Sequence, residues 1–186
     1  REPAGLALPL APRPIWMPEY TSVNATVMHL VGFSERTIRE RLLRLFRGCD
    51  RDRDFLFADT GSNEGTWSLL AAAHGCRAVA VDPQPLCISM LGAAANRSGF
   101  GDLIELHNRI LAPRSMQQGP LAVPVDQCHG TSEYHAHHSR ISDVTGEGRR
   151  YLGRRTLRQS VSPIAFEELI GTGRSVSLWH LDVEGA

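Results

Sequence analysis

Apolar and polar positions along this chain follow the period of strands and the period of helices in turn. Residues 55–58 and 78–81 are short apolar runs, typical of strands buried on both faces of a sheet, and residues 103–107 are expected to form a third strand. Apolar residues at helical spacing separate them, from Trp67 to Ala73 and over about residues 85–97. Strand, helix and strand within about thirty residues form a βαβ unit. The pattern therefore predicts an α/β fold with a doubly wound, mostly parallel, Rossmann-like sheet and helices on both faces.

Further elements are expected on either side of this unit. One helix has Ser34 as its N-cap and ends at Gly48, and its sheet-facing positions are expected to be Ile38, Leu42, Leu45 and Phe46. A second helix is expected to begin at Ser162-Pro163, an N-cap followed by proline at the first helical position, and to end at Gly171. A last strand is expected over residues 176–181.

The organisation of the chain follows from its prolines and from the loss of periodicity. Residues 1–33 begin with a proline-rich stretch, which predicts an extended arm. Residues 34–186 are expected to form one domain, because a chain of 186 residues is long enough for one core and hardly for two. Residues 112–160 have no clear period and predict an irregular insertion or a hairpin.

Composition excludes several classes of function. The 20 basic residues balance 20 acidic ones, so no net field favours nucleic acid or an anionic membrane as a partner. All the basic residues are arginines, which excludes Schiff-base chemistry and a P-loop lysine. No apolar run has the eighteen or more residues of a membrane span. We expect a small-molecule substrate, no nucleic acid and no membrane, and the oligomeric state is left open.

The four cysteines are far apart and form no Cys-x-x-Cys pair. They are expected to be free thiols, since neither a disulfide-rich secreted module nor a thiolate zinc site has this spacing. Two matches to the glycosylation acceptor pattern, at Asn24 and Asn96, leave a secretory lumen open beside the default cytoplasmic location.

Histidines gather in residues 128–138. Their spacing matches no standard zinc motif, so a polar loop is preferred to a metal site. No metal is expected.

The turns that follow the first two strands carry the candidate chemistry. Ligands of an open parallel sheet bind at the carboxyl ends of its strands. After the first strand, Gly61 and Gly65 allow a tight turn and a close backbone approach, and the next helix begins with exposed amides. After the second strand, Asp82 is placed to accept both hydroxyls of a ribose. Together these residues predict a nucleoside site.

The glycine pattern distinguishes between two cofactor classes, dinucleotides and S-adenosylmethionine. A dinucleotide needs Gly-x-Gly-x-x-Gly, whereas this turn has Gly61-x-x-x-Gly65 preceded by the carboxylate of Asp59. A carboxylate is unfavourable beside a pyrophosphate and favourable beside the ammonium and sulfonium of S-adenosylmethionine. The methyl donor is therefore preferred, with the dinucleotide as the alternative.

Three motifs resemble the FkbM-type methyltransferases, a family with the class I S-adenosylmethionine-dependent fold. Residues 59–65, Asp-Thr-Gly-Ser-Asn-Glu-Gly, are similar to that family's Asp-x-Gly-Ala-Asn-x-Gly turn. Residues 81–85, Val-Asp-Pro-Gln-Pro, are similar to its Phe-Glu-Pro-x-Pro. Residues 181–186, Leu-Asp-Val-Glu-Gly-Ala, resemble its Ile-Asp-Val-Glu-Gly-Ala signature. The resemblance covers about residues 55–186 and is weak over residues 112–160.

The resemblance implies O-methyl transfer to a hydroxyl of a sugar or another small metabolite. It implies that the methionine part of the cofactor is held by Asp59, Thr60, Gly61, Asn63 and Gly65. The resemblance also implies that Asp82 binds the ribose of the cofactor and that Asn108 lies near its adenine. Asp182 and Glu184 would lie beside the methyl group, where one of them orients or deprotonates the acceptor hydroxyl.

Two rival functions stay open at this point. Members of the family continue beyond the last motif, so the chain is expected to be a partial domain, incomplete at its C-terminal side, and a non-catalytic cofactor-binding module or inactive fragment is one alternative. A nicotinamide-dependent oxidoreductase is the other, and the missing third glycine disfavours it. The family pattern also has lysine where this chain has His180.

Overall fold

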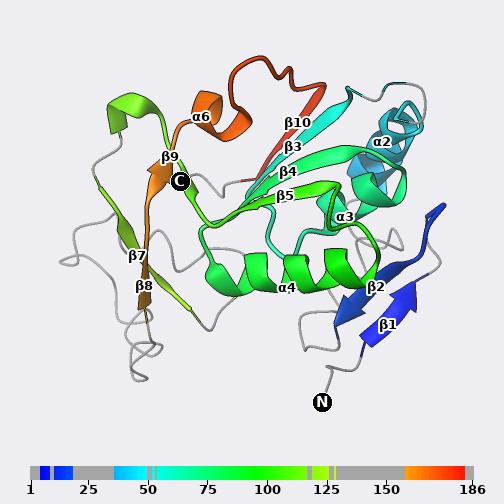
Figure 1. The fold of residues 1–186 in the computed structure, drawn as a ribbon, viewed down its shortest axis with the longest axis horizontal. Helices are drawn as coiled ribbons and strands as arrows, with labels where there is room; N and C mark the ends of the chain where they lie inside the picture. Colours follow the sequence, from blue (N-terminus) through cyan, green and yellow to red (C-terminus); the bar gives the residue numbers. More distant parts are fainter. Residues whose placement is uncertain are drawn as a thin grey trace.

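A parallel sheet forms the centre of the fold in the computed structural model, which describes residues 5–8, 11–18, 36–49, 52, 54–116, 119–125, 128 and 158–182. Its strands lie in the order β10 (Leu178–Leu181), β3 (Leu56–Thr60), β4 (Arg77–Val81) and β5 (Ile104–His107) (Figure 1). Helix α3 (Thr66–Ala73) connects β3 to β4, and α4 (Pro85–Arg97) connects β4 to β5. The predicted α/β fold with a parallel sheet is confirmed.

Both faces of the sheet are covered by apolar side chains. Phe57, Ala78 and Ala80 face one core together with residues of α3 and α4. Leu56, Ala58, Val79 and Val81 face a second core, where they meet Leu169 and Ile170 of α6 (Phe166–Ile170). Residues 56–58 of β3 and 78–81 of β4 are therefore apolar, because neither face of the sheet meets water there.

Helix α2 (Arg36–Phe46) packs on the same side of the sheet as α3 and follows the prediction in part. Leu42 and Phe46 are buried, and the Phe46 ring meets the Phe57 ring edge-on at 5.2 Å between centroids. Ile38 and Leu45 are exposed, contrary to expectation. The buried stripe of this helix is thus narrower than its sequence period suggests.

The predicted N-terminal arm is extended but is part of the packed structure. Strand β1 (Gly5–Leu8) pairs antiparallel with β2 (Ile15–Pro18), and the side chains of Ile15, Trp16 and Met17 are buried. The backbone N–H of Trp16 donates to Oγ of Ser98 at 2.8 Å, which connects β2 to the end of α4. Residues 19–33 of the expected arm lie outside the described residues.

Two small strand pairs flank the central sheet. Strand β7 (Leu121–Pro124) pairs antiparallel with β8 (Arg158–Val161), whereas residues 126–127 and 129–157 of the expected insertion or hairpin lie outside the described residues. Strand β6 (Ile110–Leu111) pairs in parallel with β9 (Pro163–Ile164), and Arg114–Met116 form one 3-10 turn.

The prediction that a helix begins at Ser162-Pro163 is wrong. These residues lead into strand β9, and the helix begins only at Phe166. Carbonyls of Ser162 and Ile164 accept the N–H groups of Ile110 and Ala112 at 3.3 and 3.0 Å. Pro163, which has no N–H, lies between these two acceptors. The fixed φ of proline suits this strand as well as it suits a first helical turn.

The prediction of free thiols is also wrong. Cys49 is bonded to Cys76 and Cys87 to Cys128, at sequence separations of 27 and 41. In each pair the Cα atoms are 5.0 Å apart, because the fold brings together cysteines that are distant in sequence. No helix in the described part of the chain is long and apolar enough to cross a membrane.

Candidate functional site

The order of the strands indicates which edge of the sheet is the candidate ligand site. From β3 the chain proceeds to β4 and β5 on one side, and it later returns to place β10 on the other side of β3. The point of reversal therefore lies between β3 and β10, at the carboxyl ends of the strands. The turn 61–65, Asp82 and Asp182 follow the ends of β3, β4 and β10 there.

The turn 61–65 alternates between left-handed and ordinary backbone. Gly61, Asn63 and Gly65 have φ of 76°, 51° and 80°. The N–H groups of Gly61 and Ser62 both donate to the carbonyl of Val81, at 2.9 and 3.1 Å, so the turn is bound to the end of β4. Asparagine adopts the left-handed region more readily than most residues with a side chain, and this explains its position in the turn.

Gly65 allows a close approach, as expected, but the group that approaches is a side chain of the protein. A Cβ atom at this position would be 2.2 Å from Cδ1 of Leu91, on the buried side of α4. Because α3 begins directly after Gly65, this glycine lets the start of α3 pack against α4. Its role in the structure is helix packing.

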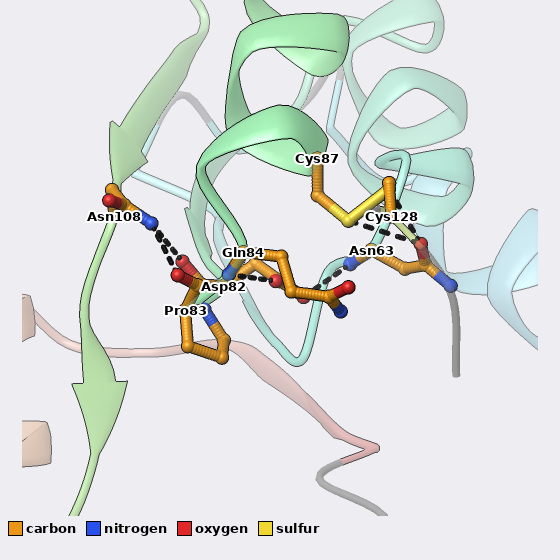
Figure 2. The surroundings of a disulfide bond; sticks show 7 residues. All are labelled: Asn63, Asp82, Pro83, Gln84, Cys87, Asn108 and Cys128. Carbon is orange, nitrogen blue, oxygen red and sulfur yellow. Dashed lines mark hydrogen bonds between the residues drawn. A yellow bond between two sulfur atoms is a disulfide. The ribbon is translucent and has the colours of Figure 1, made fainter. Parts of the chain in front are cut away.

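Asp82 is a buried carboxylate held by the backbone. It is 4% exposed; Oδ2 accepts the N–H of Asn63 at 2.9 Å and Oδ1 accepts the N–H of Gln84 at 2.8 Å (Figure 2). Burial raises the pKa of Asp82 to about 6, against the lowering effect of the two backbone hydrogen bonds, and the negative charge of Asp59 adds to the rise. Asp82 thus joins the turn after β3 to the turn after β4.

Asp59 is more deeply buried and faces α3. It is 0% exposed, and its Oδ2 accepts both the hydroxyl of Ser68 at 2.6 Å and the N–H of Ser68 at 3.1 Å. Its Oδ1 lies 3.0 Å from Nδ1 of His180 on β10. The His180 ring in turn meets the Trp67 ring edge-on. The described contacts of Asp59 are therefore with protein groups on α3 and β10.

Thr60 connects β3 to β10 through its hydroxyl. Oγ1 donates to the carbonyl of His180 and accepts the indole N–H of Trp179, each at 2.9 Å. Trp179 stacks on the ring of Phe166 from α6, with centroids 4.2 Å apart. These contacts give Thr60 a structural role between the two strands.

Asn108 follows β5 and holds the loop after β4. Its Nδ2 donates to the carbonyls of Asp82 and Pro83 at 3.0 and 2.8 Å (Figure 2). The structure therefore brings Asn108 next to Asp82 through contacts with the backbone of that loop.

Of the two candidate catalytic carboxylates, Asp182 lies among the described residues. Asp182 is exposed, and its N–H donates to the carbonyl of Thr60 at 2.9 Å, so it lies at the reversal point beside the turn 61–65. Glu184 lies outside the described residues.

Sequence reasoning missed Ser68, His180 and the disulfide beside Asn63. Oδ1 of Asn63 lies 3.4 Å from Sγ of Cys87 and 3.1 Å from Sγ of Cys128 (Figure 2). No sequence pattern indicated His180. Its role follows from the strand register, which pairs it with Asp59.

Two further polar features bear on ligands. The Ser62 hydroxyl is buried in the turn and has no hydrogen-bond partner among the described residues. No group of three metal-ligating side chains occurs in the described part of the chain, and of the histidine-rich stretch only Cys128 falls within it.

The chain is similar in part to a solved methyltransferase structure. No protein-family model and no curated protein matches the chain. An RNA methyltransferase from Salinibacter ruber, solved in complex with S-adenosyl-L-homocysteine, is 22% identical with a TM-score of 0.34, over 46% of this chain. This chain spans 63% of the length of that methyltransferase chain.

Proposed function

We propose that this chain binds S-adenosylmethionine at the carboxyl ends of β3, β4 and β10 and is part of an O-methyltransferase that acts on a hydroxyl of a small metabolite. The observation that carries the proposal is a pair of buried carboxylates, Asp59 and Asp82, at the ends of adjacent parallel strands. They flank a turn with left-handed backbone at the point where the strand order reverses.

Charge favours a cationic ligand at this edge. The negative charge of Asp59 contributes to the raised pKa of Asp82, so the two carboxylates repel each other across the turn. A ligand that brings an ammonium and a sulfonium relieves this repulsion, whereas a pyrophosphate increases it. The same argument disfavours a nicotinamide dinucleotide.

The hydrogen-bonding groups present fit an adenosyl ligand. A carboxylate offers about four lone pairs, so Asp82 keeps acceptor capacity beyond its two backbone bonds for the hydroxyls of a ribose. The buried Ser62 hydroxyl supplies a further polar group in the turn. Asn108 holds the Asp82–Pro83 backbone in place and borders the same site.

The remaining residues of the first motif act through position and charge. The turn owes its left-handed backbone to Gly61, Asn63 and Gly65. Thr60 joins β3 to β10. Asp59, buried directly before the turn, contributes its negative charge. When bound, S-adenosylmethionine supplies an electrophilic methyl group on its sulfonium.

Asp182 is the residue we assign to the acceptor. Its exposed carboxylate follows β10 at the reversal point, where it can orient an acceptor hydroxyl and take its proton. Glu184, two residues further along, is the second candidate for this role. The balance of 20 basic and 20 acidic residues favours a small acceptor such as a sugar over a polyanion.

The two disulfides favour an oxidising compartment as the site of action. Disulfides persist in secreted proteins, in the secretory lumen and in the bacterial periplasm, and they are rare in the cytosol. We therefore propose one of these oxidising compartments instead of the cytoplasm.

A label-transfer assay tests the proposed reaction. The chain is incubated with S-adenosylmethionine labelled on the methyl group and with a panel of sugars, small alcohols and an RNA oligonucleotide, and labelled product is counted. We expect transfer to a small hydroxyl compound that falls at least about 100-fold in Asp182→Asn. Transfer to RNA alone would contradict the acceptor class, and cofactor binding without any transfer would favour a non-catalytic binding module.

A further inference from the structure

The Cys87–Cys128 disulfide lies against the residue that connects the turn 61–65 to Asp82. The side-chain amide of Asn63 contacts both sulfurs, with Oδ1 at 3.4 Å from Cys87 and 3.1 Å from Cys128, as Figure 2 shows. A disulfide sulfur has no proton to donate, so these are packing contacts that hold the amide in place. Both cysteines are buried.

We propose that the Cys87–Cys128 disulfide is a positioning element of the adenosyl site, which holds the turn 61–65 in the conformation that binds the Asp82 carboxylate. The inference rests on the proposed function and adds a residue pair and a redox condition to it. The chain with this disulfide binds the cofactor more tightly than the chain without it.

The backbone of Asn63 explains why the turn needs support. Asn63 has φ of 51°, a left-handed conformation that costs free energy for a residue with a side chain. In this conformation its N–H reaches Oδ2 of Asp82 at 2.9 Å. Side-chain contacts that hold Asn63 therefore also hold one of the two hydrogen bonds of Asp82.

The other hydrogen bond of Asp82 is anchored near the same disulfide. The N–H of Gln84 donates to Oδ1, and Gln84 directly precedes α4, in which Cys87 is fully buried. The disulfide attaches Cys128, 41 residues further along, to this first turn of α4. One covalent bond thus supports both donors that hold the carboxylate.

The second disulfide provides a matched control. Cys76 directly precedes β4 and Cys49 follows α2, so this bond lies at the amino end of β4, whereas Asp82 follows its carboxyl end. Its loop of 27 residues is of similar size to the loop of 41, so the two bonds restrict the unfolded chain to similar extents. Removing either bond therefore has a similar effect on stability, but only one of them touches the turn.

The experiment compares binding of S-adenosylhomocysteine to the oxidised chain, to Cys87→Ser with Cys128→Ser, and to Cys49→Ser with Cys76→Ser. We expect the first pair to raise Kd about fivefold or more, as follows if the binding-competent turn falls to about a fifth of the population. The second pair keeps the wild-type Kd. Equal Kd values in all three proteins, or equal losses in both variant pairs, overturn the proposal.

A ligand-free readout separates this inference from the proposed function. Loss of the Asn63 hydrogen bond removes an effect that lowers the pKa of Asp82, so carboxyl NMR should give a higher pKa in the first pair than in the wild type and the second pair. If the wild type binds no S-adenosylhomocysteine, the proposed function fails, and this pKa alone decides: an unchanged value overturns the positioning role.

One substitution keeps the proposal testable if the first cysteine pair does not fold. Asn63→Gly removes the side chain that contacts both sulfurs and retains easy access to positive φ. With both disulfides intact, we expect Asn63→Gly to weaken S-adenosylhomocysteine binding, or to raise the pKa of Asp82 where no binding occurs, because the disulfide no longer holds the turn. A wild-type Kd, or an unchanged Asp82 pKa where no binding occurs, overturns the proposal.

Discussion

His180 of β10 and Asp59 of β3 are paired residues of adjacent parallel strands, and Nδ1 of His180 lies 3.0 Å from Oδ1 of Asp59. Together with Ser68, His180 compensates a carboxylate that has no contact with water. A buried carboxylate that loses a partner retains the cost of its burial without the compensating bond. The pair therefore links the first motif of the chain to its last strand by a contact between side chains.

Removal of the imidazole is expected to destabilise the protein. His180→Ala should lower the free energy of unfolding by about 2 kcal/mol, measured by urea denaturation at pH 7, because Asp59 is left with an unpaired oxygen. His107→Ala is the matched control: the contact of His107 with Glu105 is partly exposed, and the loss should be below about 1 kcal/mol. Equal losses in the two variants would contradict the importance of the buried pair.

Asp82 predicts a dependence of stability on pH. Its pKa is about 6 in the folded chain against an ordinary value of 3.8, so well below pH 4 both states carry the proton and burial has no electrostatic cost. Between about pH 4 and pH 6 the unfolded chain gives up this proton while the folded chain keeps it, so the unfolding free energy falls as pH rises, and above this window both states are ionised and the fall ends. Relative to Asp82→Asn, the wild type should lose about 2 kcal/mol of unfolding free energy between pH 4 and pH 7.

Denaturant titrations of both proteins at one-unit steps of pH measure this difference. A difference that stays constant over this range, or that favours the wild type as pH rises, would show that Asp82 does not carry a raised pKa.

Gly65 and Gly99 separate two costs of a side chain. They have φ of 80° and 73°, but a Cβ at Gly99 meets nothing within 4 Å, whereas one at Gly65 would be 2.2 Å from Leu91. Gly99→Ala should cost about 1–2 kcal/mol of unfolding free energy, from backbone strain alone. Gly65→Ala should cost at least about 2 kcal/mol more through overpacking. Similar costs in thermal or urea unfolding would contradict the close packing of α3 on α4.

The disulfides predict a loss of stability on reduction. Each loop should contribute about 4 kcal/mol by restricting the unfolded chain, so Cys49→Ser with Cys76→Ser should lower the unfolding free energy by that amount. Addition of a reductant should lower the melting temperature of the wild type below that of the unreduced variant. The reduced wild type has lost both disulfides, whereas the variant has lost one. A melting temperature that does not respond to reductant would contradict the oxidised state and the proposed compartment.

Local sequence signals predicted the elements whose environment is uniform. Helix α4 spans residues 85–97 as expected, because proline at its first position and apolar residues at helical spacing agree. Strands β3 and β4 were predicted correctly because residues 56–58 and 78–81 are buried on both faces of the sheet and are therefore continuous apolar runs. Pro163 shows the limit of such signals, since one fixed φ serves both a strand and a helix start.

Features that depend on distant pairing could not be predicted. The spacing of Cys49, Cys76, Cys87 and Cys128 carries no information about which of them meet in space. The position of Asp59 at a strand end was predictable, but the direction of its carboxylate depends on His180, 121 residues away. The sequence therefore predicted at which strand ends the candidate site lies and could not predict how the side chains there are paired.

Calorimetric titration with S-adenosylhomocysteine tests the central claim most directly. The account predicts binding to the wild-type chain, loss of that binding in Asp82→Ala, and no binding of NAD to either protein. Circular dichroism confirms that the variant is folded before it is titrated. Binding of NAD by the wild type, or no binding of S-adenosylhomocysteine by the folded wild-type chain, would contradict an adenosyl site at the carboxyl ends of β3 and β4.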